Sequence, residues 1–559
     1  MKHRRWAVVP LALGMLATAA CSNGEDTGEM NITPLPVANI NAREPQDLTQ
    51  GGELRLPVDR IGESLNPLSA DASPDLDQIR RAILPTLFQT TATGEVNPDP
   101  NYLQDFEVTS QPGEATTVTL HLNPNAVWGN GDPVTADDVV ATWRACSGQV
   151  PENNCRPDTG MEQIRDVVAV SPTEAAVSFS EATPDWTEPF ARVGILRASS
   201  VSEPSDFNQG WEELRPEWSS GPFEIENYDT DNNVITLTPN DDWWGPPAHL
   251  ARLTIVERDE AEHGSAYTAN DVDVLDAGTS AQLFAAGTEG TSSVLRRGGG
   301  TELRSLVFNT ESASAVSDPL VRQAITKTLD RSKLGTQALP DIDFTAAAAD
   351  NRIFRYGQEG YQDNATEVER NLRQARKALD EAGWEAGGDG TRTKDGQPLE
   401  VSIVRVLGNQ TSENEAREIT AQLAQVGITV VNQDVDQNTF ADGELLRGGT
   451  FQMATISHDQ TAWPLADLGE RFATGGDRNY SRTSVPEIDA ALEQLSTETD
   501  PVRRREIANQ VDVLQWQHLG TVPLYQVPES IFTRSRLANY GAMSVGTVDW
   551  ARVGYSQPQ

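Results

Sequence analysis

The sequence predicts an α/β protein built from several domains, and two patterns and the chain length support this prediction. The first half alternates polar and apolar residues over short runs, as β-strands do, at residues 53–58, 117–122, 176–179 and 234–238. The second half places a helical run, about 412–426, between strand-like runs at 399–406 and 428–431. This β-α-β order predicts a parallel pair of strands joined by a right-handed crossover. At roughly 100–200 residues per domain, 559 residues correspond to about three domains.

The N-terminus has the features of a signal peptide at residues 1–20. Basic residues at positions 2, 4 and 5 precede an apolar stretch at 6–16, which is too short to span a membrane. Small residues then lead to Cys21 and resemble the bacterial lipobox, in which cleavage precedes the cysteine and its sulfur is acylated. Thr18 stands where that motif usually has leucine. We therefore expect lipidation at Cys21, with an ordinary secreted protein cleaved near Ala20 as the alternative.

The stretch that follows Cys21 is polar, acidic and without periodicity. Residues 21–49 are therefore expected to form a flexible tether between the lipid and the folded body. The expected location is the extracellular face of the cell membrane, or the periplasm, with membrane attachment through the lipid.

The charge of the chain argues against nucleic acid as a partner. The sequence has 83 acidic and 43 basic side chains, which gives a formal net charge of −40. Such a charge repels phosphate backbones and anionic lipid headgroups. Apolar residues make up 37% of the chain, which is enough for a packed core.

Helix start and stop signals divide the chain further. Thr135 and Asp138 form a capping box for a helix from Ala136 to about residue 145. Asp318-Pro319 and Asp500-Pro501 each begin a helix. Two more helices are expected, one at about 365–382 that ends at Gly383 and one capped by Ser412 and Glu415.

No motif for catalysis, metal binding or cofactor binding occurs in the sequence. The six histidines form no H-E-x-x-H pair, and no G-x-S-x-G, S-x-x-K or G-x-x-x-x-G-K-[ST] segment is present. Cys146 and Cys155 lie nine positions apart, and in an oxidising exterior they most simply form one local disulfide. The chain is therefore expected to have no metal, no cofactor and no enzymatic activity, although a triad assembled from distant residues leaves an exported hydrolase as an alternative.

Five segments, in order over some 400 residues, resemble motifs of one family. They are A-V-W-G-N-G-D-P-V-T-A-D-D-V-V at 126–140, G-P-F at 221–223 with N-D-D-W-W-G at 240–245, L-V-F-N-T at 306–310, D-P-L-V-R-Q-A with L-D-R at 318–331, and L-D-E-A-G-W at 379–384. The chain resembles the family 5 extracellular solute-binding proteins of ABC importers, the peptide and nickel group. Most of these residues are expected to stabilise the fold rather than to contact a ligand.

The resemblance implies a two-lobed fold of the periplasmic-binding-protein type (type II, large cluster C), with an extra subdomain inserted in the first lobe. The implied first lobe takes residues 50–75, 206–300 and 521–559, the inserted subdomain 76–205 and the second lobe 301–520. Ligand would bind in the cleft between lobes that close by a hinge motion and dock on a membrane permease.

The resemblance also implies candidate ligand-binding residues. In peptide-binding members a second-lobe aspartate in a D-x-x-x-P context pairs with the ligand's ammonium group, and Asp459 matches it, although Pro464 follows after five positions rather than four. A carboxylate in a closed cleft also needs a cation on physical grounds. The other candidates are His458, Trp463, Asp71, Ser73, Gly278, Thr279, Phe308, Asn309, Gln437 and Tyr525. Each has a structural alternative: a packed tryptophan, a surface carboxylate or a core aromatic residue.

The function expected from the resemblance is that of a monomeric, lipid-anchored receptor for an ABC importer. The ligand would be a small solute, with a short peptide as the first choice. The alternatives are the exported hydrolase and a binding-protein fold reused as a sensor or an adhesin.

Overall fold

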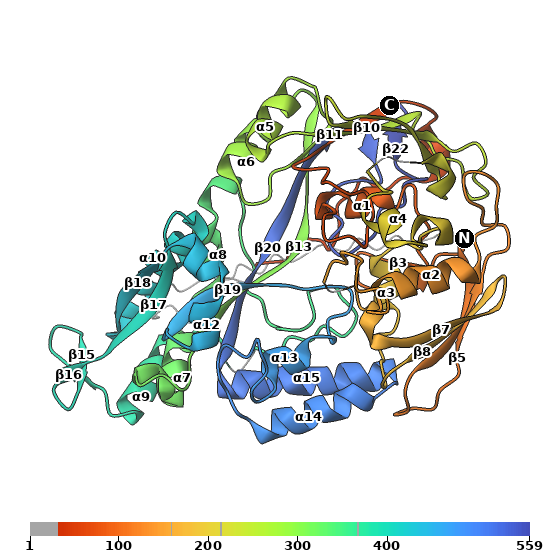
Figure 1. Ribbon diagram of the computed structural model, residues 1–559. Helices are drawn as coiled ribbons and strands as arrows, with labels where there is room; N and C mark the ends of the chain where they lie inside the picture. The colour runs from red at the N-terminus through yellow and green to blue at the C-terminus, as the bar shows by residue number, and fades with distance from the viewer. Residues whose placement is uncertain (1–31, 158, 213–214, 366–367, 559) are drawn as a thin grey trace, which may run out of the picture.

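The computed structural model describes residues 32–157, 159–212, 215–365 and 368–558 (Figure 1). The expected signal peptide and Cys21 lie outside these residues. Within them, no helix has both the length and the apolar character that crossing a bilayer requires.

One six-stranded sheet joins the two lobes. Its order is β12 (Val274–Asp276), β20 (Thr521–Arg534), β13 (Ser293–Phe308), β19 (Met453–Asp459), β17 (Glu400–Val406) and β18 (Thr429–Val435). Because β12 pairs only with the C-terminal part of β20 and β19 only with the C-terminal part of β13, the long antiparallel strands β13 and β20 cross from the first lobe into the second. Their register shifts between Gly299 and Leu303. We call this crossing point the hinge (Figure 1).

Two four-stranded sheets form the first lobe and the inserted subdomain. The first-lobe sheet has the order β2 (Glu53–Val58), β11 (Arg252–Glu257), β10 (Val234–Pro239) and β9 (Phe223–Asp229). The sheet of the inserted subdomain has the order β5 (Leu103–Val108), β6 (Thr117–Leu122), β8 (Glu174–Phe179) and β7 (Ile164–Ser171). The smaller strands are β1 (Leu48–Thr49), β3 (Phe88–Thr90), β4 (Val96–Pro98), β14 (Glu385–Ala386), β15 (Arg392–Lys394), β16 (Gln397–Pro398), β21 (Leu537–Ala538) and β22 (Gly554–Ser556).

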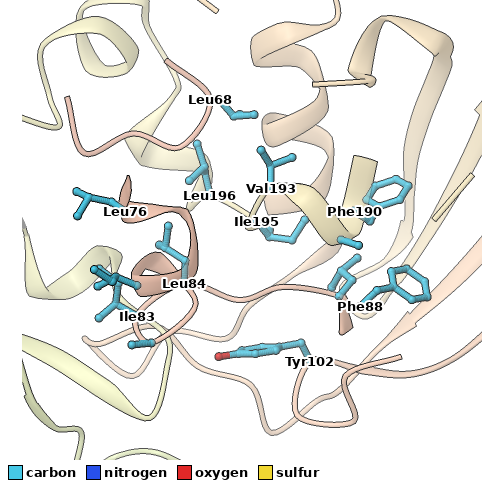
Figure 2. Close-up of a cluster of buried hydrophobic side chains, with 14 of the residues drawn as sticks. Leu68, Leu76, Ile83, Leu84, Phe88, Tyr102, Phe190, Val193, Ile195 and Leu196 are labelled. Atoms are coloured by element: carbon cyan, nitrogen blue, oxygen red, sulfur yellow. The ribbon is translucent and has the colours of Figure 1, made fainter. Parts of the chain in front are cut away.

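The inserted subdomain shares one hydrophobic core with the first lobe. Leu54 and Leu253 of the first-lobe sheet belong to the same buried cluster as Val118 and Phe190 of the insertion. Figure 2 shows part of this cluster, in which side chains from residues 68–102 and 190–196 meet. The insertion is therefore expected to move together with the first lobe.

The helices surround these sheets. Those of the first lobe and the insertion are α1 (Asp77–Arg80), α2 (Ala136–Cys146), α3 (Glu188–Arg192), α4 (Pro204–Asn208), α5 (Glu260–Thr268) and α6 (Ala281–Glu289). Those of the second lobe are α7 (Pro319–Thr328), α8 (Arg331–Ala338), α9 (Leu372–Glu381), α10 (Gln410–Leu423), α11 (Gln437–Ala441), α12 (Glu444–Gly448), α13 (Leu468–Phe472), α14 (Pro486–Thr497) and α15 (Pro501–His518). Helices α13, α14 and α15 lie together below the sheet in Figure 1, beside the insertion.

Several sequence predictions are confirmed. Strands β2 and β6 have the expected bounds, and α2 begins with the expected capping box of Thr135 and Asp138. Strands β17 and β18, which precede and follow α10 in the sequence, pair in parallel. Cys146 and Cys155 form a disulfide.

For two helices, the predicted first residue or N-cap was wrong. The helix expected from residue 365 begins at Leu372, because Asn371 caps it by accepting a hydrogen bond from the Gln374 amide. Helix α10 is capped by Asn409 rather than by Ser412, whose hydroxyl accepts a hydrogen bond from the Val406 amide instead.

The expected tether is not detached from the body over its described part. Strand β1 pairs with β22, and the backbone of Asn39 exchanges hydrogen bonds with Ala542. Leu35 packs against the core that contains β17 and α10. From residue 34 onward this segment therefore lies on the folded protein.

Candidate functional site

Three cavities lie at the hinge, between the insertion and the second lobe, and in the first lobe. The interlobe cavity, about 640 Å³, has one wall from the insertion (residues 159–192) and the other from the second lobe (residues 465–504). The hinge cavity, about 70 Å³, lies among Gly299, Gly300, the 344–361 segment of the second lobe and residues 34–37. The first-lobe cavity, about 650 Å³, contains Gly278 and Thr279.

Two side-chain contacts join the insertion to the second lobe beside the interlobe cavity. The guanidinium of Arg504, on α15, donates to both carboxylate oxygens of Asp185 at 2.8 and 2.6 Å. The indole of Trp463 donates to the Thr187 hydroxyl at 3.0 Å. Trp463 is half-buried and also packs against the core of the first lobe and the insertion, so it forms a contact between lobes, and its role as a stacking surface for ligand stays a prediction.

The loop that carries these contacts begins at Asp459, the last residue of β19. Asp459 is exposed, and it lies opposite Glu302 in the antiparallel pair of β19 and β13, next to the hinge. The following residue, Gln460, is held by the Thr301 carbonyl, to which its amide donates at 2.9 Å. Leu465 and Ala466 then line the interlobe cavity. The loop thus runs from the hinge to the interlobe cavity, and Asp459 itself lines none of the three cavities.

His458 is a mostly buried residue surrounded by charged groups. Burial, reinforced by repulsion from Arg471, lowers the pKa of His458 to about 3 in spite of the nearby Asp467 carboxylate. Asp467 lies 3.7 Å from the ring but is also paired with Arg478 at 3.0 Å. The imidazole is therefore neutral at neutral pH, and the charge of Asp467 is balanced by arginine.

We expect His458 to make stability depend on pH. Because its pKa is depressed from the usual 6.5, the unfolded state binds a proton that the folded state does not, so stability is complete above about pH 6.5 and falls as the pH falls toward 3. Between pH 7 and 5 this loss amounts to up to about 2 kcal/mol. Urea unfolding of the protein and of His458→Gln at both pH values measures it, since the difference in stability between them should shrink in the acidic sample. An equal loss in both proteins would contradict the prediction.

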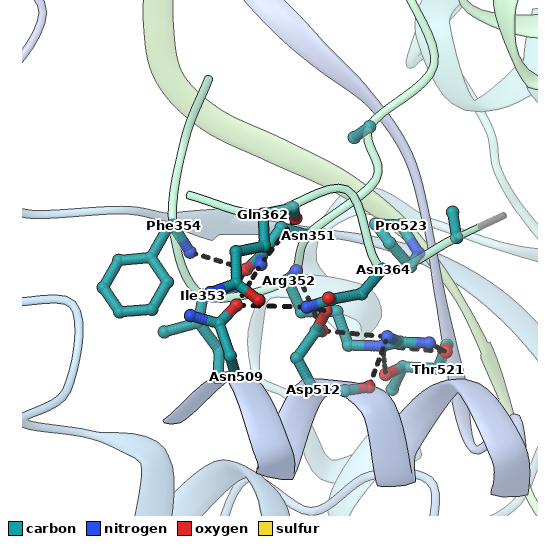
Figure 3. A network of polar contacts seen from close by, with 12 residues as sticks. Asn351, Arg352, Ile353, Phe354, Gln362, Asn364, Asn509, Asp512, Thr521 and Pro523 are labelled. Carbon is teal, nitrogen blue, oxygen red and sulfur yellow. Dashed lines mark hydrogen bonds and ion pairs between the residues drawn. The ribbon is translucent and has the colours of Figure 1, made fainter. Parts of the chain in front are cut away.

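A buried polar network fixes the second-lobe loop that faces the hinge cavity (Figure 3). The Arg352 guanidinium pairs with Asp512 of α15 at 2.9 Å and lies over the Trp516 ring at 4.0 Å. Asn364 donates to Asp512 at 2.9 Å and to Asn509 at 3.1 Å. Both ends of the loop 351–364 are therefore anchored on α15.

This loop brings Arg355 against the first lobe. The Arg355 guanidinium donates to the hydroxyl of Ser544, whose amide in turn donates to the Glu529 carboxylate at 2.8 Å. Burial raises the pKa of Glu529 to about 7, and the Asp276 carboxylate adds to this effect. Arg355 is 5% exposed, so its charge is held in the protein interior between the lobes.

The structure gives several other predicted residues roles within the fold. Asp71 is exposed and accepts a hydrogen bond from Asn154, while the buried Ser73 hydroxyl accepts one from the Asp75 amide. Gly278 and Thr279 line the first-lobe cavity. Gln437 is an exposed residue of α11 that lines none of the three cavities.

Three predicted contacts with ligand are corrected by burial. Phe308 is 0% exposed and belongs to the second-lobe core. The side-chain amide of Asn309 donates to the carbonyls of Gly449 and Phe451, which fixes the end of β13. Tyr525 is also 0% exposed, and its hydroxyl donates to Glu415 at 2.7 Å. Their side chains are enclosed by protein and have no surface for a solute in this conformation.

The family resemblance implied a hinge between the lobes, but sequence reasoning did not locate it and missed the contacts that join the lobes. Gly298-Gly299-Gly300 in the middle of a strand was a usable signal, because glycine in a strand interior marks a bulge or a close approach of backbones. Arg355, Asp185 and Arg504 carried no such signal, since each is one charged residue among many. Within the described residues, no group of three or more histidine, cysteine or acidic side chains is arranged to hold a metal ion.

Residues 105–479 match the profile of the bacterial extracellular solute-binding proteins, family 5 Middle. The chain belongs to this family. It is 31% identical to the oligopeptide-binding protein OppA of Mycobacterium bovis over 566 aligned positions, which cover 99% of this chain and 94% of that protein. This protein is therefore the solute-binding component of an ABC importer.

Solved structures share the fold of this family 5 protein. The periplasmic EDTA-binding protein EppA has a TM-score of 0.74 at 21% identity, covering 94% of this chain and 99% of its own. The periplasmic murein tripeptide-binding protein MppA, in an unliganded open form, has a TM-score of 0.74 at 17% identity, with the same coverage. At these identities the likeness establishes the two-lobed fold of the family 5 protein and nothing about its ligand.

Proposed function

We propose that this family 5 protein captures short peptides with a free amino terminus between its lobes and delivers them to a membrane permease. The observation that carries the peptide assignment is the 31% identity to an oligopeptide-binding protein over nearly the whole of both chains. MppA, which has the same fold, is named as a murein tripeptide-binding protein, and a ligand of this class is compatible with the proposal.

Asp459 is the proposed partner of the ligand ammonium group. Its carboxylate is exposed at the hinge and lies opposite Glu302 in the register of β13 and β19. Like charges directly opposite each other on antiparallel strands repel, so a cation beside Asp459 would relieve an unfavourable pair. Arg304 lies 3.9 Å from Glu302 but is committed to Glu415, at 2.6 Å, and so compensates Glu302 only weakly.

Replacing Asp459 with alanine is expected to weaken binding of a free peptide by about ten- to hundredfold, the usual range for losing a hydrogen bond to a charged group. Isothermal titration calorimetry with short peptides, first as a mixture and then singly, measures the affinity. The same peptides acetylated at the amino terminus should bind the unsubstituted protein as weakly as the free peptides bind Asp459→Ala.

Asp442→Ala is the matched control, because Asp442 is an exposed carboxylate of the same lobe, between α11 and α12. It should leave affinity unchanged. Equal affinity of Asp459→Ala and the unsubstituted protein for free peptides would remove the assignment of Asp459. Failure of every peptide to bind, together with a thermal shift by another solute, would replace the ligand class.

The proposal includes a monomer held at the membrane by lipid on Cys21. Relatives named as lipoproteins, at 23% identity, support attachment by lipid. Metabolic labelling with a fatty-acid analogue, compared between the protein and Cys21→Ser, tests it directly.

A further inference from the structure

The segment Pro34–Asn41, which we call the strap, contacts both lobes and the hinge between them. On the first lobe, the Asn39 amide donates to the Ala542 carbonyl at 2.8 Å, and the Ala542 amide donates back at 3.2 Å. The Asn41 side chain donates to the Leu537 carbonyl at 2.9 Å. The C-terminal half of the strap is therefore fixed to the first lobe.

The middle of the strap lies on the hinge. The Gly299 amide donates to the Pro36 carbonyl at 2.9 Å, at the position where the register of β13 and β20 begins to shift. A side chain at Gly298 would place its Cβ 3.3 Å from the Val37 carbonyl oxygen and 3.1 Å from the Ala542 Cβ. Glycine at this position therefore permits the close approach of the strap to the hinge strand.

The N-terminal end of the strap lies against the second lobe. Leu35 packs on a buried cluster that extends from α5 and α6 into the second lobe. Pro34, Leu35 and Val37 line the hinge cavity together with residues 344–361 of the second lobe. A Cβ at Gly357 would lie 2.3 Å from Val37 Cγ2, so the two residues are in close contact. Because Arg352 and Asn364 fix the loop of Gly357 to α15, the surface that Val37 contacts moves with the second lobe.

We propose that the strap restrains the opening of the two lobes. The pairing of strands β13 and β20 is interrupted at the register shift, and the strap is hydrogen-bonded to β13 at the same point. Rotation of the second lobe away from the first must separate Leu35 and Val37 from their apolar contacts, or break the hydrogen bond between Gly299 and Pro36. The strap therefore favours the arrangement of the lobes seen in this structure over a more open one in the absence of ligand.

The test compares two truncated chains, one that begins at residue 32 and one that begins at residue 39. The longer chain keeps the whole strap. The shorter chain keeps only the part of the strap that contacts the first lobe, residues 39–41. Spin labels on cysteines introduced at Glu181 and Ser496, exposed residues on opposite walls of the interlobe cavity, report the separation of the lobes by pulsed electron resonance. Both chains lack Cys21, and the native Cys146 and Cys155 are joined in the disulfide.

Without ligand, the chain from residue 39 should show a longer or broader distance distribution, with the population at the lobe separation of this structure reduced about fivefold or more. In the chain from residue 32, Leu35→Ala combined with Val37→Ala should produce the same change without altering the length. The matched control is Glu44→Ala combined with Gln46→Ala, at exposed positions after the strap. Identical distributions in the two truncated chains would overturn the proposal, and if the shorter chain fails to fold, the double alanine variant decides. Because no ligand is used, the outcome is independent of whether the solute is a peptide.

Discussion

Replacing Asp512 with alanine is expected to lower the free energy of unfolding by about 3–5 kcal/mol, the range for breaking a fully buried ion pair from one side. The side chains of Asp512 and Arg352 are 0% and 2% exposed, and the Asp512 carboxylate accepts hydrogen bonds from both the amide and the guanidinium of Arg352. Burial already lowers the pKa of Arg352 to about 10, against the attraction of Asp512. Without Asp512, a charged guanidinium would remain in the interior with only carbonyl and hydroxyl partners.

Urea unfolding followed by tryptophan fluorescence measures this effect, because Trp516 lies beside the pair. Arg503→Ala is the control on the same helix, since its pair with Glu506 is exposed and should contribute less than about 1 kcal/mol. A loss at Asp512→Ala no larger than that of the control would show that the loop 351–364 is held by its other contacts, such as the hydrogen bonds to Asn509, and not by the ion pair.

The second large effect is expected at Glu415, which anchors the hinge strand β13 to α10. Its carboxylate is 0% exposed, accepts two hydrogen bonds from Arg304 at 2.9 and 2.6 Å, and accepts another from Tyr525. Glu415→Ala should cost about 3–5 kcal/mol, because Arg304 keeps only the Ser457 hydroxyl and the more distant Glu302, and the Tyr525 hydroxyl loses its acceptor. Glu415→Gln keeps two hydrogen-bonding atoms and should cost less.

The pH dependence of stability distinguishes the contribution of the Glu415 charge from that of its packing and hydrogen-bonding shape. Burial opposes ionisation, but the Arg304 guanidinium outweighs it and lowers the pKa of Glu415 below the usual 4.5. A carboxylate with a lowered pKa stabilises the fold above about pH 4.5 and loses that contribution as the pH falls through its folded value. Acid titration of stability should therefore be flatter for Glu415→Gln than for the unsubstituted protein. Parallel curves would mean that the charge contributes nothing.

The sequence predicted local structure well where one signal dominated. Strand β6 alternates polar and apolar residues without interruption, and α2 begins with a complete capping box, so both had the expected bounds. Prediction failed where two signals competed. Ser412 and Glu415 have the spacing of a helix cap, yet Asn409 caps the helix and Glu415 is buried with an arginine more than a hundred positions away.

The candidate site was less predictable, because burial is a property of the assembled fold. Phe308 and Tyr525 follow from the family resemblance as cleft residues, and only their membership in a large buried cluster with residues of α7 to α10 shows that they are enclosed. Asp459 remains a prediction, placed at the hinge on an exposed strand end. Contacts between lobes such as Arg504 with Asp185 join residues 319 positions apart, and no local pattern indicates them.

The attachment of residues 34–49 to the body also limits how far the protein can reach. Residue 32, the first that the structure describes, follows Cys21 by only eleven positions. At full extension of about 3.5 Å per residue, such a linker spans less than about 40 Å. With lipid on Cys21, the edge of the molecule at the hinge would stay within that distance of the bilayer, and the protein would search for its permease by diffusion along the membrane surface.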